Sequence, residues 1–167
     1  SYYDCTPDLD EVSLETGKKC YQVIRTRRQA GAAGAVAANL KALGVGAVEA
    51  VGFCGDDGEG YELRRVMEAL GLDMSGFFTW PDRFTPTYNK PCYLDSSGKP
   101  NSASKELERI DLKNRRATPV SLQEKIIAYV RQRCSAWNGI LMLDQVQEAN
   151  RGVLTSRVRK ALIAHVR

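Results

Sequence analysis

The sequence predicts an α/β fold in which a parallel sheet is flanked by helices and carries a small antiparallel β patch. Strand and helix patterns alternate over residues 19–71. Three strand patterns then follow one another over residues 76–112, with no helix-length pattern between them. The alternation returns after residue 113 and stops in a helix without a terminal cap. We therefore expect an incomplete fold.

The first strand is predicted over residues 19–28, where Val23 and Ile24 favour extended backbone and the arginines indicate an exposed face or a site. A helix rich in small residues is expected to begin at Gly31 and to stop at Gly44. Its apolar positions recur at helical spacing and are Val36, Leu40 and Leu43. Residues 47–53 predict a second strand, followed by a helix that Gly71 ends.

The middle of the chain changes character. Strands are expected over residues 76–80, 85–95 and 105–112, with a turn at residues 96–98. Because no helix intervenes, we expect these strands to be antiparallel and to project from the α/β core.

The last third returns to the α/β rhythm. Ser121 and Glu124 have the spacing of a capping box, which predicts a helix start. The apolar run 139–143 predicts a strand covered on both faces, ended by Asp144. A final helix is expected to reach Arg167. Its inward residues are Leu154, Val158 and Leu162.

Composition narrows the class of protein. The net charge of +4 is mild for a nucleic-acid binder, so we expect no nucleic-acid partner. No apolar run has the length of a membrane span, so we expect no membrane partner. Five scattered cysteines and a single histidine, His165, predict neither a disulfide framework nor a metal site. They favour a reducing, cytoplasmic setting.

Polar groups follow three of the predicted strands, at residues 29–34, 55–58 and 144–145. In parallel sheets ligands collect at the carboxyl ends of strands, so we expect these groups to meet there. The Gly31–Gly34 turn can offer backbone amides to a ligand, or its small residues can serve close packing. Asp144 can be a helix cap or turn residue, or it can belong to a site. Lys90 can be an exposed strand residue, or it can contact a ligand.

The stretches Gln29–Leu40 and Val51–Gly60, with Gly71–Asp73 after the next helix, resemble the N-terminal half of ribokinase/PfkB carbohydrate kinases. The likeness is closer to the branch that phosphorylates D-glycero-D-manno-heptose 7-phosphate. Residues 85–90 loosely match that branch's Thr-x-Thr-Lys strand, and residues 107–111 match its Leu-x-Arg-Leu-Asp strand.

The resemblance implies a ribokinase-like fold, with an α/β core at residues 29–75 and 113–167 and a β lid at residues 11–28 and 76–112. It implies ATP-dependent phosphorylation of a sugar or sugar phosphate by the full-length enzyme, with Mg. The residues that it assigns to substrate binding are Gly31, Ala32, Gly34, Lys90 and Arg109, and we add Asp144 as a candidate because it follows a predicted strand. It also implies a possible homodimer through the lid.

Two departures limit what the resemblance implies. Ala35 stands where the family has a sugar-binding Asn, which puts the usual substrate in doubt. The family's Gly-Ala-Gly-Asp motif, which holds the catalytic base, is absent. We therefore predict no catalytic residue, no bound cofactor and no kinase activity for this chain alone. A dinucleotide-binding oxidoreductase domain and a non-catalytic sugar-binding or dimerisation module are the alternatives.

Overall fold

A computed structural model describes residues 1–94 and 105–165. The chain divides into two compact units, each described here by itself. The first unit comprises Ser1–Gln29 and Pro86–Leu112, and the second unit comprises Ala30–Thr85 and Lys113–Arg167. The turn predicted at residues 96–98 lies outside the described residues.

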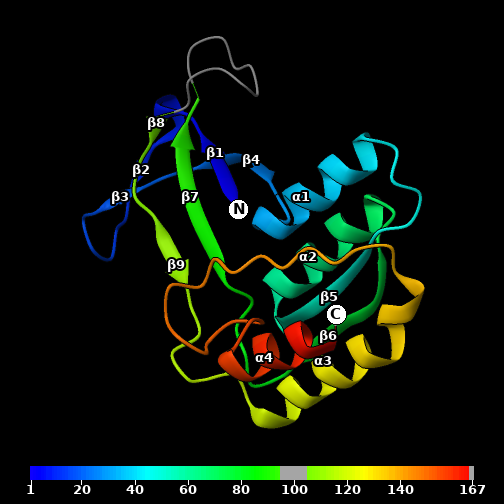
Figure 1. Cartoon of the computed structure of the whole chain (residues 1–167). Helices are drawn as coiled ribbons and strands as arrows, with labels where there is room; N and C mark the ends of the chain where they lie inside the picture. The colour runs from blue at the N-terminus through cyan, green and yellow to red at the C-terminus, as the bar shows by residue number, and fades with distance from the viewer. Residues whose placement is uncertain (95–104, 166–167) are drawn as a thin grey trace. The chain divides into compact units, whose positions relative to one another are not determined.

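The first unit is built on one β-sheet (Figure 1). Its strands, in spatial order, are β4 (Val23–Arg27), β1 (Tyr2–Cys5), β7 (Thr87–Tyr93) and β8 (Lys105–Glu106), and β9 (Ile110–Leu112) pairs with another part of β7. β1 runs antiparallel to β4 and parallel to β7, whereas β8 and β9 run antiparallel to β7. A short 3-10 turn, η1 (Pro7–Leu9), and a two-stranded ribbon of β2 (Glu11–Val12) and β3 (Lys19–Cys20) complete the unit.

The strand predicted at residues 85–95 is confirmed as β7 over its described part. The single strands predicted at residues 19–28 and 105–112 each form two short strands instead, β3 and β4 in the first case and β8 and β9 in the second. β1 was not predicted, because acidic residues and turn formers dominate the first 18 residues. The antiparallel expectation is confirmed for the pairs of β7 with β8 and with β9, and the unpredicted β1 adds a parallel pair with β7. Tyr2 and Tyr3 favour a strand, and burial of Asp4 and Cys5 fixes it at the centre of the sheet.

The second unit has three layers around the parallel pair β5 (Glu49–Gly55) and β6 (Asp73–Trp80). One face of the pair packs with α1 (Gly31–Ala42) and α2 (Gly58–Ala69), through Ala50 and Phe77. The other face packs with α3 (Val120–Arg133) and α4 (Ser156–His165). Its strand residues are Val51, Phe53, Phe78 and Trp80. A 3-10 turn, η2 (Cys134–Ala136), follows α3.

Two expectations about the sheet need correction. The strand expected at residues 76–80 in the antiparallel patch is the end of β6, which is parallel to β5 because the α2 crossover returns the chain in the same direction. Its side chains pack against helices on both faces, as in a core strand. The strand expected at 19–28 is not in this parallel sheet, because β4 pairs with β1.

The apolar run 139–143 is not a strand. Leu141, Met142 and Leu143 are 63%, 43% and 37% exposed, and no strand among the described residues pairs with the run. A run of apolar residues marks a buried strand only where a neighbouring strand offers free hydrogen-bonding groups. The prediction of a doubly covered strand here is therefore wrong.

The helices follow their predicted patterns more closely. The buried face of α3 contains Leu122, Ile126 and Val130 as expected, but the capping box is wrong. Pro119 is the N-cap without a side-chain hydrogen bond, so Ser121 lies inside the helix. Leu43 is 81% exposed, because α1 buries the smaller Gly34 and Ala37 instead.

α4 begins at Ser156, so Leu154 precedes it, whereas Val158 and Leu162 are buried as expected. The predicted helix end at residues 166–167 lies outside the described residues. None of the described helices is both long and apolar enough to cross a membrane.

Candidate functional site

The start of α1 leaves backbone amides without a side-chain cap. Ala30 is its N-cap and offers no side-chain acceptor, and no acidic residue lies in the first turn. Gly31 adopts φ +64°, which favours glycine. The first amides of any helix have no acceptor within it, so this turn can donate to an anion or a hydroxyl.

Gly34 supports the packing interpretation of this turn. A Cβ on Gly34 would come within 2.1 Å of the Ala30 Cβ, so only glycine permits the close approach of the helix to its own N-cap. Close packing therefore explains Gly34, while the left-handed backbone of Gly31 and the uncapped amides fit a ligand. The assignment of Gly31, Ala32 and Gly34 to substrate binding stays a prediction.

The start of α2 is closed by side chains. Asp57 accepts hydrogen bonds from the Gly60 amide at 2.7 Å and from the Thr85 amide and hydroxyl at 2.8 and 2.7 Å. The Thr85 hydroxyl in turn accepts from the Gly55 amide at 2.8 Å. Asp57 is thus a structural cap, and Asp56 is exposed.

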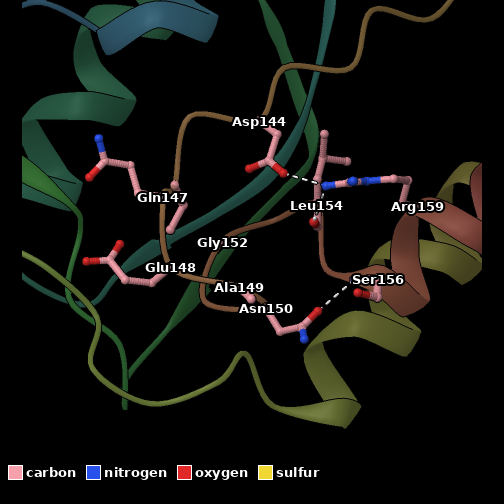
Figure 2. A pocket seen from close by; sticks show the side chains of 10 residues that line it. Asp144, Gln147, Glu148, Ala149, Asn150, Gly152, Leu154, Ser156 and Arg159 are labelled. Carbon is pink, nitrogen blue, oxygen red and sulfur yellow. Dashed lines mark hydrogen bonds and ion pairs between the residues drawn. The ribbon is translucent and has the colours of Figure 1, made fainter.

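Asp144 lies at the edge of an open hollow of about 260 Å³ in the second unit (Figure 2). Its Oδ2 lies 2.6 Å from Nη2 of Arg159, and both side chains are partly exposed. The other polar side chains that line the hollow are Gln147, Glu148, Asn150 and Ser156. Two carboxylates and one guanidinium give acceptors as well as donors, which suits a ligand with hydroxyl groups.

A buried polar network holds one wall of this hollow. Arg83 is 6% exposed and donates from Nη2 to the Arg151 carbonyl at 2.8 Å and from Nη1 to the Arg116 carbonyl at 2.8 Å. The Thr118 amide donates to the Asn150 carbonyl at 2.8 Å. Burial lowers the pKa of Arg83. Sequence reasoning missed Arg83, because nothing in the pattern distinguishes a buried arginine from the many exposed ones.

Lys90 and Arg109 lie in the first unit, each paired with a carboxylate. Lys90 Nζ is 2.8 Å from Glu106 Oε2, and this hydrogen bond raises the pKa of Lys90. Arg109 Nε is 2.8 Å from Asp111 Oδ1. The guanidinium of Arg109 also lies over the Tyr88 ring, at 4.7 Å from its centroid.

The same sheet contains a buried carboxylate that sequence reasoning missed. Asp4 is fully buried and accepts hydrogen bonds from Arg27 and Arg25. The bond from Arg27 is the main cause that lowers the pKa of Asp4; burial opposes it and Arg25 adds to it. The same bond raises the pKa of Arg27. The only sequence signal was the arginine-rich strand pattern at residues 19–28.

The three polar groups do not all follow strands of one parallel sheet. Only the Gly55–Gly58 group follows a strand of that sheet. Gly31 follows β4, which belongs to the first unit's sheet, and Asp144 follows no strand. The strand assignment behind that expectation is wrong at residues 19–28 and 139–143, and the meeting of the three groups stays a prediction.

No family model matches the sequence. The chain is 31% identical over 158 residues to the bifunctional protein HldE of Geobacter metallireducens, which covers 95% of this chain and 29% of that protein. It is 29% identical to HldE of Geotalea uraniireducens, over 93% of this chain and 29% of that protein. A fructokinase structure from Halothermothrix orenii matches 78% of this chain and 40% of its own, with 16% identity and a TM-score of 0.34.

The chain therefore spans less than a third of the length of the curated relatives that it matches. The sequence likeness nevertheless extends over nearly all of its own residues. The curated relatives that the chain matches are thus HldE proteins, to which it is similar over nearly all of its own residues, and the solved structures that it resembles are sugar kinases.

Proposed function

We propose that this chain forms part of the sugar-binding side of a sugar kinase that phosphorylates a sugar or sugar phosphate with ATP. The sequence likeness to HldE proteins over 95% of the chain supports the reaction class. The single structural observation that supports the role of this chain is the uncapped start of α1, with left-handed backbone at Gly31. Amides in this arrangement can bind the hydroxyl or anionic groups of a sugar phosphate.

ATP and Mg²⁺ are assigned to the whole protein and not to this chain. Within residues 1–94 and 105–165, no group of three His, Cys, Asp or Glu side chains is placed to hold a metal ion. We expect the chain alone to bind sugar phosphate without turning it over, because the Gly-Ala-Gly-Asp motif is absent from its sequence. The free cysteines among the described residues, three of them buried, suit a reducing compartment.

The dinucleotide-binding alternative has weaker support. Its fingerprint needs a strand that leads into the glycine-rich turn and pairs in parallel with the next strand. Here β4 precedes Gly31 but pairs antiparallel with β1, and the parallel partner of β5 is β6.

Calorimetry separates these functions. We expect the chain to bind a heptose 7-phosphate and to give no heat with NAD⁺, and an ATP-dependent phosphorylation assay should show no product. Tight binding of NAD⁺ without binding of the sugar phosphate would overturn the proposal. Turnover of the sugar by this chain alone would overturn its assignment as non-catalytic.

A dimerisation role has one specific observation in its favour. β4 is an edge strand in the order of the first unit's sheet, and its Val23 and Ile24 are 47% and 51% exposed. Exposed apolar edge strands are ready to pair with a second copy. We propose a homodimer through this edge.

Light scattering should show that the parent chain is a dimer and that Ile24→Asp is a monomer. Leu43→Asp, at an exposed position of the second unit, is the control and should remain a dimer. A monomeric parent chain would contradict the proposed dimer.

A further inference from the structure

A row of three side chains crosses the middle of the first unit's sheet. Tyr2 on β1 is in register with Arg27 on β4 and with Lys90 on β7. Residues in register on neighbouring strands project to the same face, so the three lie side by side. The Arg27 guanidinium lies 4.7 Å from the centroid of the Tyr2 ring, and Lys90 Nζ lies 5.8 Å from it.

Asp4 fixes the position of Arg27. Nε and Nη2 of Arg27 donate to this fully buried carboxylate at 2.9 and 2.7 Å, and Nε of Arg25 donates at 2.7 Å. Two guanidinium groups share one carboxylate, so the trio has one net positive charge. Among the described residues no hydrogen bond uses Nη1 of Arg27, whose side chain is 27% exposed. A held arginine with an unused donor and excess positive charge is suited to bind an anion.

Lys90 supplies the second cation, and its present partner is exchangeable. Its ammonium group is 2.8 Å from Glu106, which is 44% exposed on the two-residue strand β8. Exposed ion pairs of this kind contribute little to stability. A phosphate group has more charge and more acceptor oxygens than a carboxylate, so it can replace Glu106 at Lys90.

We propose that Arg27 and Lys90, on the two strands beside Tyr2, bind the phosphate group of a phosphorylated sugar, and that Asp4 is the positioning residue of Arg27. This deepens the proposed function, on which it rests, by adding Arg27, Tyr2 and Asp4 to the predicted contact at Lys90. The shared ligand chemistry is a phosphate dianion, either on the sugar or free in solution.

The test is a calorimetric titration of the full chain with inorganic phosphate and, separately, with a heptose 7-phosphate. Arg27→Gln should weaken both at least tenfold. Arg25→Gln is the matched control, because Arg25 holds the same carboxylate but has no place in the row; it should weaken binding less than threefold. Glu106→Gln should tighten binding severalfold by freeing Lys90. Tighter binding of the sugar phosphate than of inorganic phosphate would identify the sugar as the source.

The variant Asp4→Asn shows whether Asp4 acts by positioning Arg27 or by its negative charge. It makes the cluster more positive, so simple attraction predicts tighter phosphate binding, whereas loss of positioning predicts weaker binding. We expect weaker binding, with the circular dichroism of a folded chain. If this variant does not fold, the comparison of Arg27→Gln with Arg25→Gln decides the proposal.

Equal phosphate affinity in Arg27→Gln and the parent chain would overturn this inference, as would equal losses in Arg27→Gln and Arg25→Gln. A third titration, with the unphosphorylated heptose, distinguishes this failure from failure of the proposed function. If the unphosphorylated heptose and the heptose 7-phosphate bind with equal affinity, only the proposed phosphate site is wrong. If neither sugar nor sugar phosphate binds, the proposed function fails as well.

Discussion

Two helices of the second unit begin in glycine-containing turns, yet their starts differ. α2 begins after Asp57, whose two carboxylate oxygens are occupied by the Gly60 amide and by Thr85. α1 begins after Ala30, which has no side chain to offer, and Gly31 holds left-handed backbone in open space. The backbone amides at the start of α2 thus have a side-chain acceptor within the protein, and those at the start of α1 have none.

The difference separates a structural motif from a binding candidate. Glycine in the α2 start is explained by packing, since a Cβ on Gly60 would come within 2.3 Å of the Gly55 carbonyl oxygen. No atom lies within 4 Å of a Cβ on Gly31, so packing does not explain that residue. Polar groups that the fold does not satisfy are where a ligand is expected to bind.

The largest expected effect is that of Gly60→Ala. The new Cβ meets backbone oxygen and the Thr85 hydroxyl, neither of which can move freely, so we expect the free energy of unfolding to fall by about 3 kcal/mol. Urea denaturation measures this. A loss of less than about 0.5 kcal/mol, the range of ordinary surface substitutions, would show that the α2 start is not closely packed.

Asp57→Ala should have the next largest effect. It removes the cap of α2 and the acceptor for two hydrogen bonds from Thr85, so we expect a loss of about 2 kcal/mol of unfolding free energy. Asp56→Ala is the control, because Asp56 is exposed and does not cap the helix; it should stay within about 0.5 kcal/mol of the parent. Equal losses in the two variants would contradict the assignment of the cap.

Gly31→Ala should have the smallest effect on stability and a separate effect on binding. The new methyl group has space but must adopt φ +64°, which costs about 1 kcal/mol. We expect calorimetry to show weaker binding of a heptose 7-phosphate, because relief of the strain moves the amides of the turn. Unchanged binding with the expected loss of stability would make Gly31 a purely structural residue.

Much of the fold was predictable where local pattern and packing agree. The stripe of Leu122, Ile126 and Val130 predicted the buried face of α3, since helical spacing directly encodes a face. The strand prediction at residues 139–143 was wrong, because apolar side chains do not indicate whether a neighbouring strand is present to pair with the run. β6 was assigned to the wrong sheet for a related reason: strand partners are set by tertiary contacts.

The candidate site was predictable only in part. The turn at Gly31–Gly34 is visible in the sequence because glycines follow a strand pattern and open a helix pattern there, although the sequence leaves both ligand binding and close packing open. Asp4 and Arg27 were not, since their pairing joins β1 with β4 and an unpredicted strand cannot suggest a partner. Arg83 likewise gains its role from carbonyl groups more than 30 residues away.

Nuclear magnetic resonance most directly tests the claim that the open start of α1 binds substrate. Amide chemical shifts of the ¹⁵N-labelled chain would be followed during titration with a heptose 7-phosphate. We predict saturable shifts at Gly31, Ala32 and Gly34, with Gly58 and Gly60 at the closed start of α2 unchanged. Saturation that moves the α2 amides and leaves those of α1 unmoved would contradict the account.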